Sequence, residues 1–374
     1  MKNRIIHLTT VHARTDTRIR YKEVETLSDL YPNQVMLVVQ DGKGDEDVNQ
    51  RYKIHDIGKR PKSRFLRAVN GSTKILFVIL KLRPKIVHFH DPELIPFAVL
   101  LRLFGLRIIY DVHEDLPKQI LSKDYIKSVY LRKILSFLAS VIEIVAGQLF
   151  SRIIVTTTKI GDRFPKHKTA LVRNYPKLEI LSSNCIEKKS ETHFVVSYAG
   201  SLTKSRGITD LVNAMEFLPD TYKMQFLGSF QPPGLEIECK ALEGWQKCEY
   251  LGRVPHSQIG EYISSAHLGV QMMHDIPNYT GGIATKIFEY LALGVPTLMS
   301  DTPERRNDYH SLTHFAKPAN PEDIASKIQY IRNNYTAVLE QTKINQAFVL
   351  EKMTWKNEGH TLANVYAELL KKST

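Results

Sequence analysis

The densest set of residues able to do chemistry lies between positions 278 and 296. Gly281 and Gly282 stand directly before a helical pattern, and consecutive glycines can turn several backbone N–H groups toward one anion. Lys286 and Glu289 follow three residues apart, so they share one helix face. A carboxylate there can accept hydrogen bonds from two vicinal hydroxyls, as on a ribose; the alternative is a solvent-facing ion pair. The segment predicts a site for a sugar-linked anion.

A second candidate is the turn over residues 198–207. Gly200 lets the backbone approach a ligand closely, and Lys204 and Arg206 supply positive charge just before a predicted helix. Helix N-termini favour anions as well. The turn therefore predicts a diphosphate cradle, against the alternative of an ordinary strand–helix loop with exposed basic residues.

The first half contributes histidines and acids near predicted strand ends. His12, Asp16 and Arg18 follow the first strand, where contacts to an acceptor or a phosphate are common. His113 ends the run 110–113 and could hold a sugar hydroxyl or an acceptor, or simply cap the strand. His88 and His90 alternate along one strand, and we expect one of the two to face the core.

Short Val- and Ile-rich runs alternate with helical patterns along the whole chain. Such continuous apolar runs are typical of parallel strands buried on both faces, and the alternation predicts doubly wound α/β domains. The expected strands are 4–8, 34–39, 53–57, 85–90, 107–111, 152–156, 170–172, 194–198, 223–227, 249–251, 268–271, 296–299 and 314–316.

We expect four segments: a first domain over 1–175, a polar linker over 176–192, a second domain over 193–350 and a C-terminal helix over 351–374. The last is expected to pack back toward the first domain. Ligands of such sheets bind outside the carboxyl ends of the strands.

Bulk properties narrow the class of protein. The 374 residues carry a net charge of +12, which favours phosphate-rich partners. Three cysteines, Cys185, Cys239 and Cys248, form no paired motif and suit a reducing compartment rather than a zinc or disulfide scaffold. The first apolar run, 5–8, is too short for a secretory signal, so we expect a cytoplasmic location.

Two segments bear on membranes. Residues 59–85 hold nine Lys or Arg and no acid, interleaved with aliphatic residues. This pattern indicates either a basic amphipathic surface that meets an anionic membrane or surface helices that pack on a sheet, and the two are compatible. The apolar stretch 134–150 is short for a bilayer span, and we expect a buried helix.

Taken together, these motifs resemble the retaining glycosyltransferases of the GT-B fold, specifically family 4. The similar segments are Tyr-Ala-Gly-Ser…Arg-Gly at 198–207, Tyr-Leu-Gly-Arg-Val at 250–254, and Lys-Ile-Phe-Glu-Tyr-Leu-Ala-Leu-Gly-Val-Pro at 286–296. In the first half they are 86–91 and 110–115, and the opening 11–19 is similar to a subset that builds bacterial surface polysaccharides. The resemblance implies two Rossmann-like domains that face each other across a cleft.

The resemblance also implies roles for individual residues. Glu289 would bind the nucleotide ribose, and Arg206 with Lys204 would neutralise the diphosphate. The backbone of Gly281, Gly282, Ile283 and Ala284 would meet phosphate or sugar, Arg253 and Val254 would flank the base, and His113 would lie near the reacting sugar.

Two positions depart from the family pattern. Gly281 stands where the family has its first Glu, so that Lys286 takes over part of that region, and Ser201 stands where the family has its first Arg.

The expected function is transfer of a sugar, with retention, from a UDP- or GDP-linked donor to a glycan or lipid-linked acceptor in cell-surface polysaccharide synthesis. No metal or other cofactor is expected, and the protein could lie peripherally on the inner face of the membrane. The alternatives are a nucleotide-sugar epimerase of the same shape and a basic nucleic-acid-binding protein. The second is disfavoured because aliphatics rather than stacking aromatics interleave the basic run.

Overall fold

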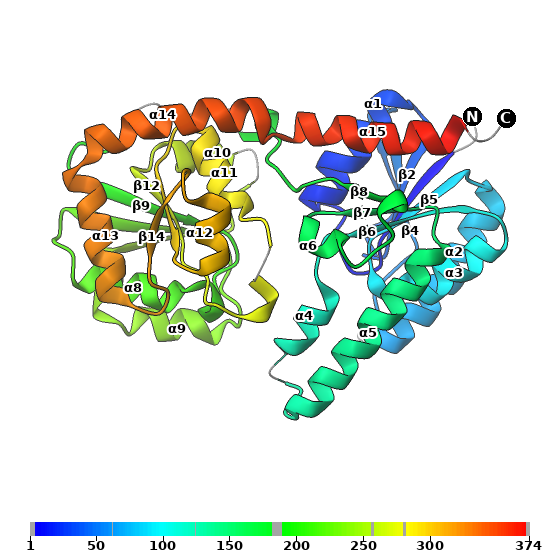
Figure 1. The fold of residues 1–374 in the computed structure, drawn as a ribbon, viewed down its shortest axis with the longest axis horizontal. Helices are drawn as coiled ribbons and strands as arrows, with labels where there is room; N and C mark the ends of the chain where they lie inside the picture. The colour runs from blue at the N-terminus through cyan, green and yellow to red at the C-terminus, as the bar shows by residue number, and fades with distance from the viewer. Residues whose placement is uncertain are drawn as a thin grey trace. The chain divides into compact units, whose positions relative to one another are not determined.

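The computed structural model describes residues 4–61, 63–123, 125–181, 189–255, 258–279 and 282–371, with the backbone alone at 64–69 and 278. The chain divides into two compact units (Figure 1). Unit 1 contains residues 1–174 and 356–374, and unit 2 contains residues 175–355. Each unit is a twisted sheet covered by helices.

Unit 1 is built on an eight-stranded sheet in the order β3-β4-β2-β1-β5-β6-β7-β8. All neighbouring strands are parallel except the β3–β4 pair. The strands are β1 Ile5–Leu8, β2 Val35–Val39, β3 Glu46–Val48, β4 Tyr52–Asp56, β5 Ile86–Phe89, β6 Arg107–Val112, β7 Arg152–Val155 and β8 Thr169–Leu171.

The helices of unit 1 include one unusual element, the π-helix η1 (Thr17–Val24), which Asp16 caps by accepting from the Ile19 N–H. Single π-turns often mark functional sites, and this one runs over eight residues. The other helices are α1 Glu25–Leu30, α2 Arg64–Leu82, η2 Pro92–Leu94, α3 Ile95–Leu103, α4 Leu116–Leu121, α5 Val129–Leu149, α6 Thr158–Gly161, η3 Lys166–Lys168 and α15 Trp355–Lys371.

Unit 2 is built on a six-stranded, fully parallel sheet in the order β11-β10-β9-β12-β13-β14. The strands are β9 Phe194–Ala199, β10 Tyr222–Leu227, β11 Cys248–Gly252, β12 Leu268–Gln271, β13 Thr297–Ser300 and β14 His314–Ala316. The helices are α7 Leu178–Leu181, η5 Lys204–Arg206, α8 Ile208–Glu216, α9 Gly234–Lys240, η6 Glu243–Lys247, α10 Ile259–Ser264, η8 Pro277–Tyr279, α11 Thr285–Ala292, α12 Pro303–Tyr309, α13 Pro321–Asn333 and α14 Tyr335–Lys352.

The predicted strands are confirmed with small shifts at their ends, and central strands such as β1, β2 and β5 are buried on both faces of the sheet. The acidic edge strand β3 was not predicted, since Glu46–Val48 carries no apolar run. Of the C-terminal helix expected over 351–374, residues 355–371 form α15, whereas residues 351 and 352 belong to the preceding helix α14.

The prediction of a buried helix over 134–150 is wrong. Helix α5 turns most of its large apolar side chains outward and two polar ones inward: Phe137 is 68% exposed, whereas Ser136 and Glu143 are buried. The buried polar groups are satisfied, because Glu143 accepts from Tyr110 Oη at 2.7 Å and Ser136 donates to the Pro117 carbonyl at 2.9 Å. None of the described helices combines the length and apolarity needed to span a bilayer.

We expect Gly207→Ala to lower the free energy of unfolding of unit 2 by about 2–4 kcal/mol. Gly207 has φ of 73°, and a Cβ built there would lie 2.1 Å from the Met272 carbonyl oxygen. Both tryptophans, Trp245 and Trp355, lie in unit 2, so urea unfolding followed by tryptophan fluorescence reports on this unit.

Gly234→Ala is the matched control. Gly234 opens α9, and no heavy atom lies within 4 Å of its ideal Cβ position. Its substitution should be neutral or should stabilise by up to about 1 kcal/mol. Equal losses from both variants would contradict the close approach at Gly207.

Candidate functional site

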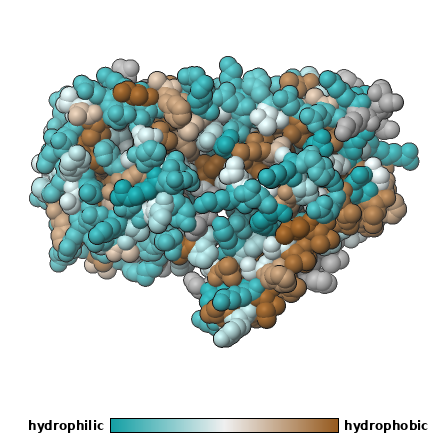
Figure 2. All heavy atoms as spheres, in the orientation of Figure 1, coloured by the Kyte–Doolittle hydropathy of each residue, from teal (hydrophilic) through white to brown (hydrophobic). Residues whose placement is uncertain are grey.

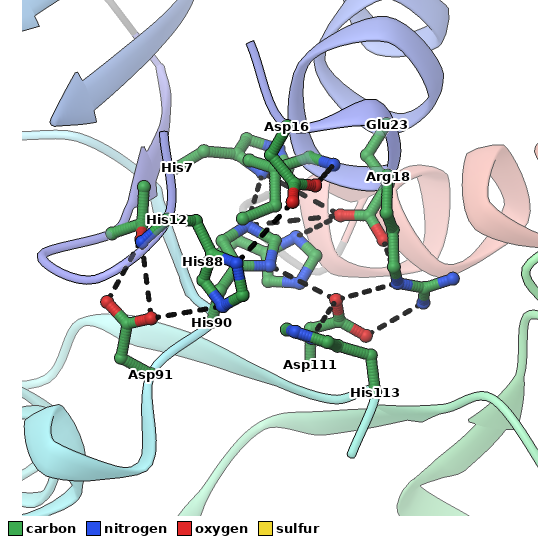
Figure 3. Close-up of polar contacts among 12 residues, drawn as sticks. His7, His12, Asp16, Arg18, Glu23, His88, His90, Asp91, Asp111 and His113 are labelled. Atoms are coloured by element: carbon green, nitrogen blue, oxygen red, sulfur yellow. Dashed lines mark hydrogen bonds and ion pairs between the residues drawn. The ribbon is translucent and has the colours of Figure 1, made fainter. Parts of the chain in front are cut away.

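The carboxyl ends of β1, β5 and β6 hold a polar cluster in unit 1 (Figure 3). Asp91, which follows β5, fixes the loop after β1 because its carboxylate accepts from the Thr10 N–H at 2.5 Å and the Val11 N–H at 3.2 Å. The Thr9 and Thr10 hydroxyls donate to the same carboxylate. The loop that carries His12 is thereby tied to the neighbouring strand.

Asp111, near the end of β6, is the centre of this cluster. Arg18 donates to both of its oxygens, from Nε at 2.9 Å and from Nη2 at 2.8 Å. His90 Nδ1 and His113 Nδ1 lie 3.1 and 3.2 Å from Asp111 Oδ2. Burial alone would raise the pKa of Asp111, but Arg18 and the two imidazoles outweigh it and hold that pKa well below its usual value.

The charge on Asp111 decides the state of His113. An ionised carboxylate can only accept hydrogen bonds, so His113 must carry its proton on Nδ1. The other ring nitrogen, Nε2, is then left as an acceptor in the neutral imidazole. The geometry leaves His113 Nε2 able to accept a hydrogen bond from a hydroxyl group.

His12 lies between two carboxylates, with Nδ1 3.4 Å from Asp16 Oδ2 and Nε2 3.4 Å from Asp91 Oδ1. Its ring centroid is 5.0 Å from that of His113. Burial opposes a charged imidazole, but Asp16, Asp91 and Glu114 overcome this and raise the pKa of His12. The partner Asp16 is likewise held ionised against its burial by His12 and the Ile19 N–H, which lower its pKa to about 2.

A cavity of about 800 Å³ opens beside these residues within unit 1. His12, Asp91, His113 and Glu114 line it as polar groups. Apolar side chains, among them Pro92, Ile95, Pro96, Leu116 and Ile142, line it as well and carry it to helices α4 and α5. The cavity therefore has one polar part that can form hydrogen bonds and one apolar part.

Two predictions for this region need correction. Arg18 was predicted to contact an acceptor or phosphate, but it is only 4% exposed and its guanidinium is committed to Asp111 and the Val172 carbonyl. His88 and His90 were expected to divide between core and surface. Both are buried, because residues two apart on a strand share a face.

In unit 2 the turn after β9 carries the predicted diphosphate cradle. Gly200 has φ of 153°, and the Arg206 guanidinium lies 3.3 Å from the position its Cβ would take. Arg206 is held beside Tyr198 and Tyr279; burial alone would lower its pKa, but these hydroxyls raise it. Lys204, by contrast, is 62% exposed at its side chain and pairs with Glu238 of α9 at 2.5 Å.

Helix α11 carries Lys286 and Glu289 as an ion pair with Nζ 2.5 Å from Oε2. The pair is not the solvent-facing alternative, because the Glu289 side chain is only 11% exposed. The adjacent Tyr290 accepts from the Ala199 N–H at 3.0 Å and donates to the Ser197 carbonyl at 3.1 Å. The tyrosine fixes α11 to the carboxyl end of β9, next to the turn that carries Arg206.

The remaining predicted donor residues follow other strands at the same edge of the sheet. Arg253, exposed, and Val254, half-buried, come after β11. Gly282 is exposed with open space at its Cβ position, and Ile283 is half-buried. The Ala284 N–H donates to Tyr309 Oη at 2.9 Å, so it is already used and is not free for phosphate as predicted. Gly281 lies outside the described residues.

Sequence reasoning missed three residues at this edge. Tyr279 and Arg305 lie with Gly282 around a small pocket, and Arg305 donates to the Met273 carbonyl at 3.1 Å. A Cβ on Gly228, which follows β10, would lie 1.8 Å from the Gly200 carbonyl oxygen. For Arg305 the sequence does hold a signal. Thr302-Pro303 is a helix-start pattern, and it places Arg305 in the first turn of α12.

Among the described residues, two groups could hold a metal ion. One is His7, Glu23, His88 and His90; the other is His90, Asp111 and His113. Both lie in unit 1, away from the predicted donor residues along the chain.

The raised pKa of His12 predicts a pH-dependent contribution to stability. Because the folded state favours the imidazolium, His12 stabilises fully below the unfolded pKa of about 6.5, and this stabilisation is lost as pH rises through the higher folded pKa. We expect His12→Gln to destabilise more at pH 5.5 than at pH 8.5 in urea unfolding followed by circular dichroism.

The control for loss of an imidazole is His167→Gln, at an exposed site in η3. A larger loss for His12→Gln at pH 8.5 than at pH 5.5 would contradict the assigned charge state.

Comparison with known proteins agrees with this architecture. Residues 184–347 match the family model described as Glycosyl transferases group 1. A Bacillus subtilis (strain 168) protein, TuaC, named as a teichuronic acid biosynthesis glycosyltransferase, is 32% identical over 104 residues. That match covers 28% of this chain and 24% of TuaC, so it spans about a quarter of the relative's length.

Two solved structures resemble nearly the whole chain. Sucrose-phosphate synthase of Thermosynechococcus elongatus superposes with a TM-score of 0.78 at 14% identity, covering 99% of both chains. Anabaena HepE in complex with UDP-glucose gives 0.73 at 11% identity, covering 97% of this chain and 99% of HepE. The chain thus has the GT-B fold of two parallel-sheet α/β domains, and its residues 184–347 match the glycosyl transferases group 1 family.

Proposed function

We propose that this chain is a glycosyltransferase that moves a sugar from a nucleotide-diphosphate sugar onto a lipid-linked glycan. The observation that carries the proposal is the edge of unit 2 where β9 ends. There a half-buried arginine, Arg206, packs against Gly200, and the recessed carboxylate of Glu289 is fixed nearby through Tyr290. The match of residues 184–347 to a glycosyltransferase family supports the same conclusion.

Positively charged side chains bind the diphosphate of the donor, and a carboxylate accepts hydrogen bonds from its ribose. Arg206 is fixed before any ligand arrives, and a preorganised cation stabilises negative charge as it builds on a leaving diphosphate. Arg305 and Lys286 add positive charge at the same edge of the sheet. Glu289 offers two acceptor oxygens for vicinal ribose hydroxyls once Lys286 turns toward phosphate. The nucleotide of the donor is UDP or GDP, and the HepE complex with UDP-glucose favours UDP.

Transfer proceeds through a transition state like an oxocarbenium ion, as in glycoside hydrolysis. We propose retention of configuration, with attack on the face that the diphosphate leaves, from the resemblance to retaining enzymes of family 4. His113 Nε2, left as an acceptor by Asp111, orients a hydroxyl of the donor sugar or the acceptor. No metal or cofactor is assigned to the transfer step.

The cavity in unit 1 favours a transferase over an epimerase. An epimerase needs no acceptor, whereas this cavity of about 800 Å³ adds a second, partly apolar compartment beside His113. A glycan fits the polar part and a lipid carrier fits the apolar part that reaches Ile142 of α5. Nucleoside diphosphate should therefore be released at an appreciable rate only when an acceptor is present.

The lipid-linked acceptor is proposed to lie in an anionic membrane. Figure 2 shows apolar side chains gathered along α5. Lys123, Lys127, Arg132 and Lys133 lie just before or in its first turns, against one acid, Asp124. Basic residues next to an apolar helix face favour anionic lipid surfaces. The exposed apolar residues of α5 are Val129, Tyr130, Leu131, Ile134, Leu135, Phe137, Leu138, Val141, Ile142, Val145 and Leu149.

The apolar surface therefore centres on α5 rather than on the segment 59–85 that the sequence indicated. That segment contributes Phe77 and Leu80 of α2, while its Ile75 and Ile79 pack into the core. The protein would then work at the cytoplasmic face of a membrane that carries its acceptor, in the synthesis of a cell-surface polysaccharide.

Donor binding is the first test. We expect one of UDP-, GDP- or ADP-linked sugars to raise the melting temperature in a thermal-shift panel, because a ligand of the folded state stabilises by mass action. Glu289→Gln should weaken that donor's Kd by about tenfold or more, since a charged hydrogen bond contributes roughly 1.5–3 kcal/mol.

Glu340→Gln, an exposed carboxylate on α14, is the control and should bind as the parent does. Unchanged donor affinity in Glu289→Gln would contradict the assigned ribose contact. No change in melting temperature with any nucleotide sugar would contradict the transferase function itself.

Membrane docking is tested by co-sedimentation with vesicles of phosphatidylcholine alone or mixed with phosphatidylglycerol. We expect more pelleting with the anionic vesicles and at least tenfold weaker partition for the double variant Ile134→Ser/Phe137→Ser, since each buried side chain contributes about 1.5–3 kcal/mol.

The control is Ile237→Ser/Tyr330→Ser, which removes two apolar side chains of comparable exposure, 75% and 56%, from unit 2. Equal pelleting with both vesicle types, or equal loss in both double variants, would exclude docking through α5.

A further inference from the structure

Four buried side chains in unit 1 converge on one point. His7 comes from β1, His88 from β5, His90 from the residue after β5, and Glu23 from the π-helix η1. Figure 3 draws these side chains close together. None of the four is more than 1% exposed. One ligand atom from each lies within 4.8 Å of every other. Three imidazoles and a carboxylate form a donor set that suits divalent transition metals.

The distances from Glu23 to the three imidazoles are longer than hydrogen bonds, whereas His7 Nδ1 and His90 Nε2 lie 3.1 Å apart, within hydrogen-bond distance. Glu23 Oε2 lies 3.9 Å from each of His7 Nδ1, His88 Nδ1 and His90 Nε2. Hydrogen bonds to nitrogen span about 2.7–3.2 Å, so none of these three contacts is one. Ligand atoms about 2.1 Å from a tetrahedral ion lie about 3.4 Å apart. A small inward movement would therefore close the group around one ion.

Among the described residues Glu23 has an ion-pair partner in Arg18 but no hydrogen-bond partner. Neither of its oxygens has a hydrogen-bond partner, although both are buried. Oε1 lies 3.1 Å from Arg18 Nε, but Arg18 directs its hydrogen bonds to Asp111. Arg18 balances charge at Oε1 only, so Oε2 is a buried acceptor without a hydrogen bond, and a cation at Oε2 would satisfy it.

Residues around the group already orient two imidazoles for metal binding. His90 donates from Nδ1 to Asp111 at 3.1 Å, which leaves Nε2 free of a proton and pointed at Glu23. His7 places Nε2 3.1 Å from Tyr366 Oη, and donation there likewise leaves Nδ1 as the ligand atom. This is the arrangement by which carboxylates and hydroxyls behind metal-bound histidines fix the ring.

His88 can become the fourth ligand if its Nδ1 exchanges the hydrogen bond to Tyr366 for a bond to the ion. Its Nδ1 lies 2.7 Å from Tyr366 Oη, and its Nε2 is buried without a partner. Without an ion, hydrogen bonds can run from His88 through Tyr366, His7 and His90 to Asp111. That chain satisfies the imidazole nitrogens it includes but leaves both Glu23 oxygens unbonded.

We propose that His7, Glu23, His88 and His90 bind one divalent transition metal ion, with Zn²⁺ the best match, in a closed structural site. All four ligands come from the protein, which is typical of structural rather than catalytic zinc. The ion joins β1, β5 and η1, and through His90 it supports Asp111 and thus His113 at the cavity. The site is separate from the donor chemistry and does not depend on the proposed function.

Metal content tests the proposal without any assay of activity. Tag-free protein should carry close to one Zn²⁺ per chain by inductively coupled plasma mass spectrometry. After chelation, added Co²⁺ should restore one equivalent with the intense visible absorption of tetrahedral cobalt. His88→Ala and the isosteric Glu23→Gln should each lower the affinity for Co²⁺ at least tenfold.

His55→Ala, which removes a histidine of β4 that pairs with Asp45, should keep the full equivalent. Protein that contains no transition metal and binds neither Zn²⁺ nor Co²⁺ after chelation would overturn the proposal and leave the hydrogen-bonded histidine chain. Undiminished binding in Glu23→Gln would overturn it as well. That variant keeps the side-chain shape, so it serves if His88→Ala fails to fold.

Discussion

A parallel strand that is covered on both faces can present polar side chains to a ligand chiefly beyond its carboxyl end. Both sheets of this chain obey that constraint, and only the short edge pair β3–β4 departs from it. In unit 1 the ends of β1, β5 and β6 bring Asp91, Asp111 and His113 together. In unit 2 the end of β9 gathers Arg206 and the anchored helix α11.

Burial makes these clusters rigid. Asp111 is an ionised carboxylate without solvent, and it remains so because Arg18 and two histidines donate to it. Removing one partner from such a set leaves an uncompensated charge, which is why each member constrains the others. The π-helical turn contributes both Arg18 and Glu23 to this polar interior, which an α-helix of the same residues would orient differently.

The fold could be predicted from the sequence because buried parallel strands leave an unmistakable pattern of Val and Ile. The positions of single side chains could be predicted only in part. Glu289 and Arg206 stand at helix and turn positions that local spacing fixes, whereas Arg18 looked like a ligand contact and proved to be an internal partner. Helix α5 was misjudged because hydropathy counts apolar residues without saying that Ser136 and Glu143 would be the side chains turned inward.

The central claim is that unit 2 holds a nucleotide diphosphate at the carboxyl edge of its sheet. A crystal structure of the chain with bound UDP or GDP tests this most directly. The account predicts diphosphate density next to the Arg206 guanidinium, with ribose hydroxyls on the Glu289 carboxylate. A nucleotide bound at any other part of the molecule, with Arg206 and Glu289 still facing Tyr198 and Lys286, would contradict it.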